Sequence, residues 1–212
     1  MDETVVDVRG VRTVGPDTVA LDLETPDGFD ALPGQFVLLR AEIDGEELSR
    51  YYTLSSPTVG ETFEITVGVD PDGDLTPWLA DLDEGAEVRI EGPFGNVSYD
   101  DEGDVVVVAG GPGIGPAVAI AERAVERGHE ATVVYQDDEP AHEDRLVELE
   151  DSGALVQVFG DDADGEVGDA VVAASDRGDL YVFGFQDFCE LVQDALADAG
   201  LDPDEANVES FG

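Results

Sequence analysis

The chain has 212 residues, 42% of them hydrophobic, and carries 52 acidic side chains against nine basic ones, all arginine, for a net charge of −43. Its regular runs of Val, Ile, Leu and Ala argue against disorder, and the lack of basic clusters excludes nucleic acid and anionic membranes as partners. The charge is typical of a halophilic, haloarchaeal-type protein, because the screening length falls to about 3 Å at 1 M salt; an ordinary acidic protein is the alternative.

The first half of the chain consists of short β-rich runs separated by turn residues such as Pro26-Asp27-Gly28. It opens without a basic segment followed by an apolar one, and no run reaches about 18 apolar residues, so we expect a cytoplasmic protein without membrane insertion. A short helix is expected over residues 76–81, with Thr76 as N-cap and Pro77 at the first helical position. Six strands predict a small antiparallel β-barrel, a domain over residues 1–100. The expected strands cover residues 4–13, 18–24, 35–41, 50–55, 62–69 and 87–92.

The second half, residues 101–212, alternates apolar strands with helical stretches. Parallel neighbours need crossover connections, so this rhythm predicts a second α/β domain with a doubly wound, five-stranded parallel sheet and ligands at the carboxyl ends of its strands. The expected strands cover 104–109, 130–135, 155–159, 179–183 and 206–210, and the helices cover 116–127, 143–151, 166–174 and 187–199.

The cysteine and histidine content limits the chemistry of the chain. Cys189 is the only cysteine, which excludes an internal disulfide and a four-thiolate iron–sulfur cluster, so any such cluster belongs to a partner. His129 and His142, both in predicted surface turns, show neither a metal-binding nor a triad spacing. We therefore expect no metal site.

Residues 50–57 place an arginine, two tyrosines and three hydroxyls in one short strand. Side chains alternate along a strand, so Arg50 and Tyr52 point one way and Tyr51 and Thr53 the other. A flavin nucleotide needs a cation for its pyrophosphate, a flat aromatic for its ring and a hydrogen-bond partner at flavin N5. An ordinary edge strand is the alternative. The chain has only nine arginines, however, and the presence of one of them in this strand favours a site for an anionic ligand.

These residues match the pattern R-x-Y-[ST]-x-x-[ST], met by Arg50, Tyr52, Thr53 and Ser56. The pattern resembles the FAD signature of the ferredoxin reductase superfamily, which includes cytochrome b5 reductases and the reductase domains of flavohaemoglobins. The runs PGQF at 33–36 and GPFG at 92–95 are similar to further motifs of that family.

The resemblance implies a role for each FAD-site residue. Arg50 would bind the pyrophosphate, Tyr52 would pack on the isoalloxazine, and Thr53 would act catalytically at flavin N5. Residues 73–76 look like the family's GGxxS phosphate segment. Relatives usually carry Val-Lys or Val-Arg where this chain has Val67 and Gly68, so one expected cation is missing. The implied FAD-binding residues are Arg50, Tyr51, Tyr52, Thr53, Ser56, Val67, Gly68, Gly73, Asp74, Leu75, Thr76 and Phe211.

The second half carries a glycine-rich loop at residues 109–116, between a Val-rich strand and a helix. Glycines there let the backbone approach a pyrophosphate and leave the helix N-terminus open to it, although an ordinary tight turn is the alternative. The loop resembles the family's GGTGIAP nicotinamide-nucleotide motif. The implied NAD-binding residues are Gly110, Gly111, Pro112, Gly113, Ile114, Pro116, Gln136, Asp137, Phe183 and Gly184.

Three places in this half depart from the family's pattern or leave two interpretations open. Pro112 replaces a threonine, and Phe183-Gly184-Phe185 replaces Cys-Gly-Pro, so the two phenylalanines either narrow the nicotinamide pocket or belong to the core. The close of the chain resembles the family's E-x-F-G, which implies that Glu209 acts catalytically near the nicotinamide and that Phe211 covers the flavin; strand packing of Phe211 is the alternative.

The resemblance implies an enzyme that moves hydride between NAD(P)H and FAD and passes electrons to a separate acceptor such as ferredoxin. Residues 137–139 offer three carboxylates where NADP-users carry cations, which favours NADH, unless these acids are only halophilic surface. Two alternatives stay open: a flavoprotein that exchanges electrons only with protein partners, and a non-catalytic, flavin-binding regulatory subunit. The sequence fixes neither the acceptor nor the oligomeric state.

Overall fold

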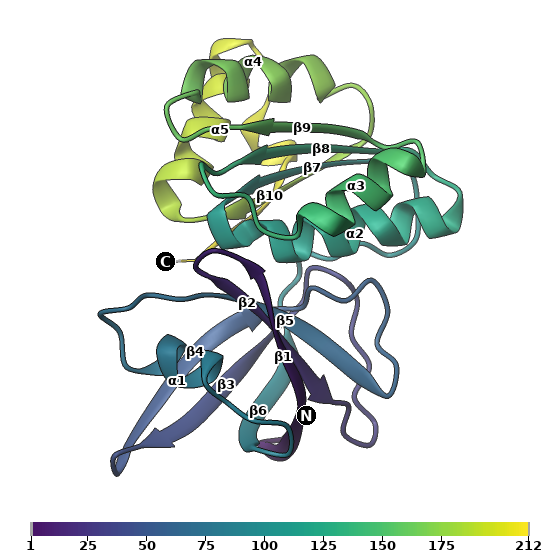
Figure 1. The fold of residues 1–212 in the computed structure, drawn as a ribbon. Coiled ribbons are helices and arrows are strands. Elements are labelled where there is room, and N and C mark those ends of the chain that lie inside the picture. Colours follow the sequence, from purple (N-terminus) through teal and green to yellow (C-terminus); the bar gives the residue numbers. More distant parts are fainter. Residues whose placement is uncertain (1, 212) are drawn as a thin grey trace.

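A computed structural model describes residues 2–211, so Gly212 of the predicted E-x-F-G segment lies outside the described residues. An antiparallel sheet formed by the first half lies below a parallel sheet formed by the second half (Figure 1). Helices α2 (Ile114–Arg127) and α3 (Glu143–Asp151) lie on the side of the parallel sheet that faces the antiparallel one. None of the helices within residues 2–211 is both long and apolar enough to cross a membrane.

The antiparallel sheet has the six strands predicted, in the order β4-β3-β6-β1-β2-β5. A bridge between Leu54 and Ile65 brings the two edges of the sheet together and closes it toward a barrel. Strand β4 begins before the expected residue 50, because Asp44 and Gly45 both have positive φ and form a two-residue hairpin turn. The strands are β1 (Thr4–Gly15), β2 (Thr18–Glu24), β3 (Phe36–Ile43), β4 (Glu46–Thr53), β5 (Thr62–Gly68) and β6 (Glu87–Phe94).

The short helix of the barrel half begins one residue earlier than expected. Helix α1 spans Leu75–Ala80 with Asp74 as N-cap, so the predicted N-cap Thr76 is wrong and Pro77 is the third helical residue. The hydroxyl of Thr76 instead accepts a hydrogen bond of 3.0 Å from the backbone N–H of Asp70. The preceding turn therefore uses the oxygen that a cap would have offered to the helix.

The parallel sheet has the predicted five strands in the order β11-β10-β7-β8-β9. Helices α2 and α3 pack on one face, and α4 (Asp164–Ala174) and α5 (Gln186–Asp198) pack on the other. The chain reverses its winding direction between β7 and β10, which is where such sheets bind ligands. The strands are β7 (Val105–Gly110), β8 (Ala131–Gln136), β9 (Leu155–Phe159), β10 (Asp179–Gly184) and β11 (Asn207–Ser210), with single 3₁₀ turns η1 (Gly111–Gly113) and η2 (Pro203–Glu205).

Strand β5 joins the two halves through its outward face. Its apolar residues pack into the barrel core, and since side chains alternate along a strand, Glu64, Thr66 and Gly68 point the other way. Thr66 Oγ1 and His142 Nε2 share a hydrogen bond of 2.8 Å. A Cβ placed on Gly68 would lie 3.6 Å from Pro112 of the glycine-rich loop. One face of β5 thus contacts two parts of the α/β half: His142, which precedes α3, and the glycine-rich loop.

A buried ion network fixes this contact. Arg145 on α3 donates to Glu122 on α2 at 2.6 and 2.7 Å, to Glu64 on β5 at 3.0 Å, and to the carbonyl of Ser55 at 2.8 Å. Arg12 pairs with the second carboxylate oxygen of Glu64. The side chains of Glu64 and Arg145 are only 10% and 19% exposed. Because Arg12 and Glu64 belong to the barrel half and Glu122 and Arg145 to helices of the α/β half, the network holds the two halves in one orientation.

His142 contradicts its expected place in a surface turn, because it is only 4% exposed. Its backbone N–H donates to the carbonyl of Val14 at 2.7 Å, which ties the loop before α3 to strand β1. Burial, together with the nearby charges of Arg145 and Arg12, lowers the pKa of His142 to about 3. The imidazole is therefore neutral and serves as a structural contact between the two halves.

Candidate functional site

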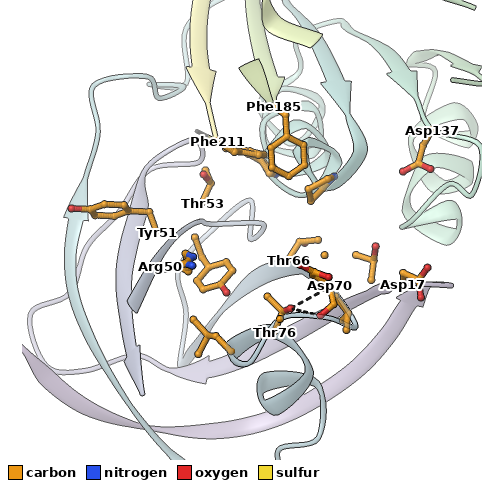
Figure 2. A pocket seen from close by; sticks show the side chains of 18 of the residues that line it. Asp17, Arg50, Tyr51, Thr53, Thr66, Asp70, Thr76, Asp137, Phe185 and Phe211 are labelled. Carbon is orange, nitrogen blue, oxygen red and sulfur yellow. Dashed lines mark hydrogen bonds between the residues drawn. The ribbon is translucent and has the colours of Figure 1, made fainter. Parts of the chain in front are cut away.

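A cavity of about 530 Å³ lies where the barrel meets the carboxyl-terminal edge of the parallel sheet. Figure 2 shows Arg50, Thr53, Thr66 and Thr76 on the barrel side, with Phe185 and Phe211 facing them from the α/β side. The lining residues are Asp17, Thr18, Arg50, Tyr51, Tyr52, Thr53, Thr66, Gly68, Val69, Asp70, Gly73, Asp74, Leu75, Thr76, Pro112, Pro116, Asp137, Phe185 and Phe211. The cavity therefore brings together segments from both predicted sites.

Arg50 is the only arginine in this lining, and no carboxylate within residues 2–211 pairs with it. Apart from Arg177, every other arginine lies within 4.0 Å of a carboxylate. Arg50 makes only a 2.8 Å hydrogen bond from Nη1 to the carbonyl of its neighbour Ser49. A cation left unpaired in so acidic a chain is suited to an anionic ligand, and its guanidinium matches the geometry of phosphate.

Tyr52 and Thr53 form the wall beside Arg50. The hydroxyl of Tyr52 is buried and has no hydrogen-bond partner in the described part of the chain. Burial, partly offset by the charge of Arg50, raises the pKa of Tyr52 to about 12, so its hydroxyl stays protonated and can donate. Leaving such a donor unsatisfied costs about 1–3 kcal/mol. A bound group that accepts this hydrogen bond would remove the cost. The wall is therefore suited to a flat ligand with several hydrogen-bond acceptors.

The turn that leads into α1 forms another wall of the cavity. The amide of Gly73 donates to the carbonyl of Asp70 at 3.0 Å, and Thr76 is tied to the same residue by the bonds drawn in Figure 2. Asp74 and Leu75 line the cavity beside them. The predicted phosphate segment therefore faces the cavity, but the amide of Gly73 is already used inside the turn.

The glycine-rich loop is shaped partly by packing. A Cβ on Gly110 would lie 2.6 Å from the ring of Phe188, and one on Gly113 would lie 2.1 Å from the carbonyl oxygen of Phe183. Gly111, with φ of 53°, has open space where a Cβ would stand. Close packing thus explains two of these glycines, whereas Gly111 leaves room in front of the loop.

A second cavity, of about 540 Å³, lies in front of this loop. The side-chain amide of Gln136 donates to the carbonyl of Asp161 at 3.1 Å and to Asp164 Oδ1 at 2.9 Å. Burial and the nearby carboxylates of Asp138 and Asp137 raise the pKa of Asp161. A phosphate bound here would therefore meet a negative field. The lining residues are Gly110, Gly111, Gln136, Asp161, Asp164, Phe185, Asp187, Phe188 and Leu191.

The two phenylalanines that flank Gly184 have different environments. Phe183 is fully buried in the core of the parallel sheet, whereas Phe185 is 55% exposed and lines both cavities. Phe211 lines the 530 Å³ cavity, and its ring stands edge-on to that of Phe185 with centroids 6.2 Å apart. Its backbone N–H donates to the carbonyl of Gly184 at 2.9 Å. The alternative of a core position therefore holds for Phe183 and not for Phe185.

Several predicted site residues lie behind these walls. Val67 lies in the barrel core and Ile114 in the core between the parallel sheet and α2, and the hydroxyl of Ser56 accepts a 2.6 Å hydrogen bond from the backbone of Glu64. Glu209 on β11 is partly buried, and that burial raises the pKa of its carboxyl. Roles for these side chains remain predictions. The predicted residues outside both linings are Ser56, Val67, Gly113, Ile114, Phe183, Gly184 and Glu209.

Sequence reasoning missed several lining residues. Thr66 shares a strand face with Gly68, so strand alternation could have found it. Asp17 and Thr18 carried no local signal, because only the fold brings the β1–β2 turn to the cavity. The acids at the second cavity follow β9 and β10, and the rule that ligands lie at the carboxyl ends of parallel strands could have found them. The missed residues are Asp17, Thr18, Thr66, Val69, Asp70, Asp161, Asp164, Asp187, Phe188 and Leu191.

The sequence is similar to a known protein family and to several individual proteins. Residues 6–99 match the family described as the oxidoreductase FAD-binding domain. The flavohemoprotein of Pseudomonas aeruginosa is 30% identical over 213 residues, which cover 90% of this chain and 54% of that protein. The chain belongs to the ferredoxin reductase-like family. The family predicted from its motifs is thereby confirmed, and the barrel half of this ferredoxin reductase-like chain is an FAD-binding domain.

Two further comparisons describe what this family member resembles. The glycine betaine monooxygenase reductase subunit of Pseudomonas aeruginosa is 44% identical over 93 residues, or 42% of this chain and 25% of that protein. The chain thus spans 25% and 54% of the lengths of these two curated relatives. A crystal structure of a ferredoxin NADP+ reductase from Neisseria gonorrhoeae with bound FAD and NADP shares the fold, with a TM-score of 0.82, 17% identity and 100% coverage of both chains.

Proposed function

We propose that this ferredoxin reductase-like chain takes hydride from NAD(P)H, with NADH favoured, and passes the electrons to a separate acceptor protein such as ferredoxin. The observation that carries this proposal is the unpaired Arg50 beside the unsatisfied hydroxyl of Tyr52, in a cavity that opens toward the glycine-rich loop. The similarity to a reductase subunit of a monooxygenase supports delivery of electrons to another protein.

Each part of the chain would then have a defined task. When bound, the nicotinamide supplies a hydride, and FAD accepts it and releases electrons singly or in pairs. Arg50 would pair with the pyrophosphate, the hydroxyl of Tyr52 would donate to the bound group, and Thr53 would lie at flavin N5. The ion network around Arg145 would keep the two cavities aligned. No acid–base pair is needed, so the work of the chain is alignment.

The proposal is tested by a visible spectrum of the purified protein in molar salt, before and after anaerobic addition of NADH. We expect a flavin spectrum that is bleached by NADH. A protein that binds no flavin when FAD is added would contradict the assignment of the cavity beside Arg50 as the flavin site. Bleaching followed by reoxidation with an added ferredoxin would support the acceptor class.

A second function is favoured by the position of Phe185 and Phe211. The two rings stand together on the α/β side of the 530 Å³ cavity, where a nicotinamide would have to enter (Figure 2). If they never part, the chain is a flavoprotein that exchanges electrons only with protein partners. Bound FAD that is reduced by a protein donor but not by NADH or NADPH would distinguish this function from the first.

We expect NADH to be preferred over NADPH by roughly 5- to 150-fold in kcat/KM, a transition-state difference of about 1–3 kcal/mol. Asp137 and Asp161 lie at the ends of β8 and β9, and Arg145 is engaged by Glu122 and Glu64. The 2′-phosphate of NADPH, with nearly two negative charges, would be repelled there. Initial rates with both nucleotides at the same high salt give the ratio.

The nucleotide preference should also respond to salt, because screening weakens repulsion between the carboxylates and the phosphate. The NADPH rate should therefore gain more than the NADH rate as KCl rises. Asp137→Asn is the matched variant, since it removes one charge and keeps the shape of the side chain. Equal use of both nucleotides in molar salt, unaltered in this variant, would contradict the assignment.

We propose a salt-rich cytoplasm as the working environment and expect stability to rise with salt. The net charge of −43 imposes a self-repulsion that ions screen. The melting temperature should rise by about 5 °C or more between 0.1 M and 3 M KCl, since each kcal/mol moves it by about 2–4 °C in a chain of this size. A melting temperature that does not change with KCl concentration, or that rises equally in a non-ionic osmolyte, would contradict stabilisation by charge screening.

A further inference from the structure

Phe185 combines an anchored backbone with an exposed side chain. It follows strand β10, and its backbone is anchored because its carbonyl accepts the first hydrogen bond of helix α5, from the amide of Cys189 at 3.1 Å. Its side chain is nevertheless 55% exposed. The ring can therefore change position by rotating about its own side-chain bonds while the backbone stays in place.

The ring of Phe185 stands between the two cavities. Phe185 is the one residue common to the linings of the 530 Å³ and 540 Å³ cavities within residues 2–211. On the side of the 530 Å³ cavity, the ring meets Phe211 edge-on, at an interplanar angle of 87°. On the other side the second cavity continues to the glycine-rich loop and to Gln136. A molecule that occupied both cavities would therefore contact this ring.

We propose that Phe185 is a gate that closes the passage from the nucleotide cavity to the flavin cavity and must rotate away before a nicotinamide ring can enter. The inference rests on the proposed function, since it takes the 530 Å³ cavity as the flavin site and the 540 Å³ cavity beside the glycine-rich loop as the nucleotide site. It adds a residue that selects between the two ends of the dinucleotide. The adenosine diphosphate end binds without opening the gate, whereas the nicotinamide end binds only when the gate is open.

The physical basis is a competition between two rings for one apolar surface. In the closed state, Phe185 packs against Phe211 and covers the surface on which another flat ring would lie. Rotation of an exposed side chain is fast. The gate therefore determines the fraction of molecules that are open to the nicotinamide, and it does not slow the binding step. If the open state holds about one tenth of the molecules, the apparent affinity for the nicotinamide end falls about tenfold.

The test compares NAD+ with ADP-ribose, which lacks the nicotinamide, by titrating the FAD-loaded protein in 3 M KCl and measuring heat and flavin absorbance. The wild-type chain should bind both ligands with nearly equal affinity. Phe185→Ala should bind NAD+ about tenfold more tightly and ADP-ribose as before, and the bound nicotinamide should produce a long-wavelength absorbance beside the flavin. Because the side chain is exposed, we expect this variant to keep the wild-type melting temperature.

Leu191→Ala is the matched control, because Leu191 lies on helix α5, which Phe185 precedes, and lines only the nucleotide cavity. It should change the affinities for NAD+ and ADP-ribose by the same factor. Equal affinities for the two ligands in Phe185→Ala, with no new absorbance, would overturn the gate and leave the proposed function standing. If neither ligand binds to the wild-type chain or the variants while FAD stays bound, the nucleotide site itself is refuted, and the gate with it.

Discussion

Replacing Arg145 by methionine is expected to lower the free energy of unfolding by about 3 kcal/mol, near the lower end of the range for breaking a buried ion pair. Methionine keeps much of the length of the side chain but leaves the carboxylates of Glu64 and Glu122 without their shared partner. Glu64 retains Arg12 and Ser55, which is why the larger values are not expected. Denaturant unfolding in 3 M KCl measures the loss.

The matched control is Arg9→Met, which removes an equal charge from an exposed pair with Glu24. An exposed pair contributes about 0–1 kcal/mol, so this variant should unfold nearly as the wild type does. Similar losses in the two variants would show that the network is not the joint between the halves. The Arg145 variant should also slow flavin reduction by NADH more than it weakens FAD binding, because it loosens the alignment of the two cavities.

Replacing Arg50 by alanine is expected to weaken FAD binding by about 2–4 kcal/mol, or roughly 30- to 1,000-fold. Arg50 is the only arginine in the lining of the 530 Å³ cavity and is free of carboxylate partners within residues 2–211. Its loss would leave the pyrophosphate facing a chain of net charge −43. FAD titration of the apoprotein, followed by the quenching of flavin fluorescence, measures the change.

Arg177→Ala provides the control for charge alone. Arg177 is exposed, and like Arg50 it lacks a carboxylate partner in the described chain, but it lines neither cavity. The Arg177→Ala variant should therefore bind FAD as the wild type does. If both variants hold FAD equally well, the pyrophosphate does not lie at Arg50. High salt should reduce the difference between the two variants, because ions screen the phosphate.

The sequence by itself determined the two sheets, because the signals that specify them are local. Alternating apolar residues and turn signals specified the six barrel strands, and helices between apolar strands specified the parallel sheet. The FAD motif was readable for the same reason: Arg50, Tyr52 and Thr53 lie in one short segment, and a strand brings them to one cavity. Where a local signal was overlooked, as in the Asp44-Gly45 turn, the boundary of β4 was misplaced.

Only the tertiary structure decided which side chains are buried, paired or free. Phe183 and Phe185 look alike in the sequence, yet β11 and the helices cover the first, while the second extends past the end of its strand. His142 and Arg145 read as surface residues, but strand β5, more than 70 positions away, supplies Thr66 and Glu64 as their partners. The spacing of apolar residues shows which residues of one helix or strand share a face. Burial and ion pairing depend on which distant segment packs against that face, and the spacing does not contain this information.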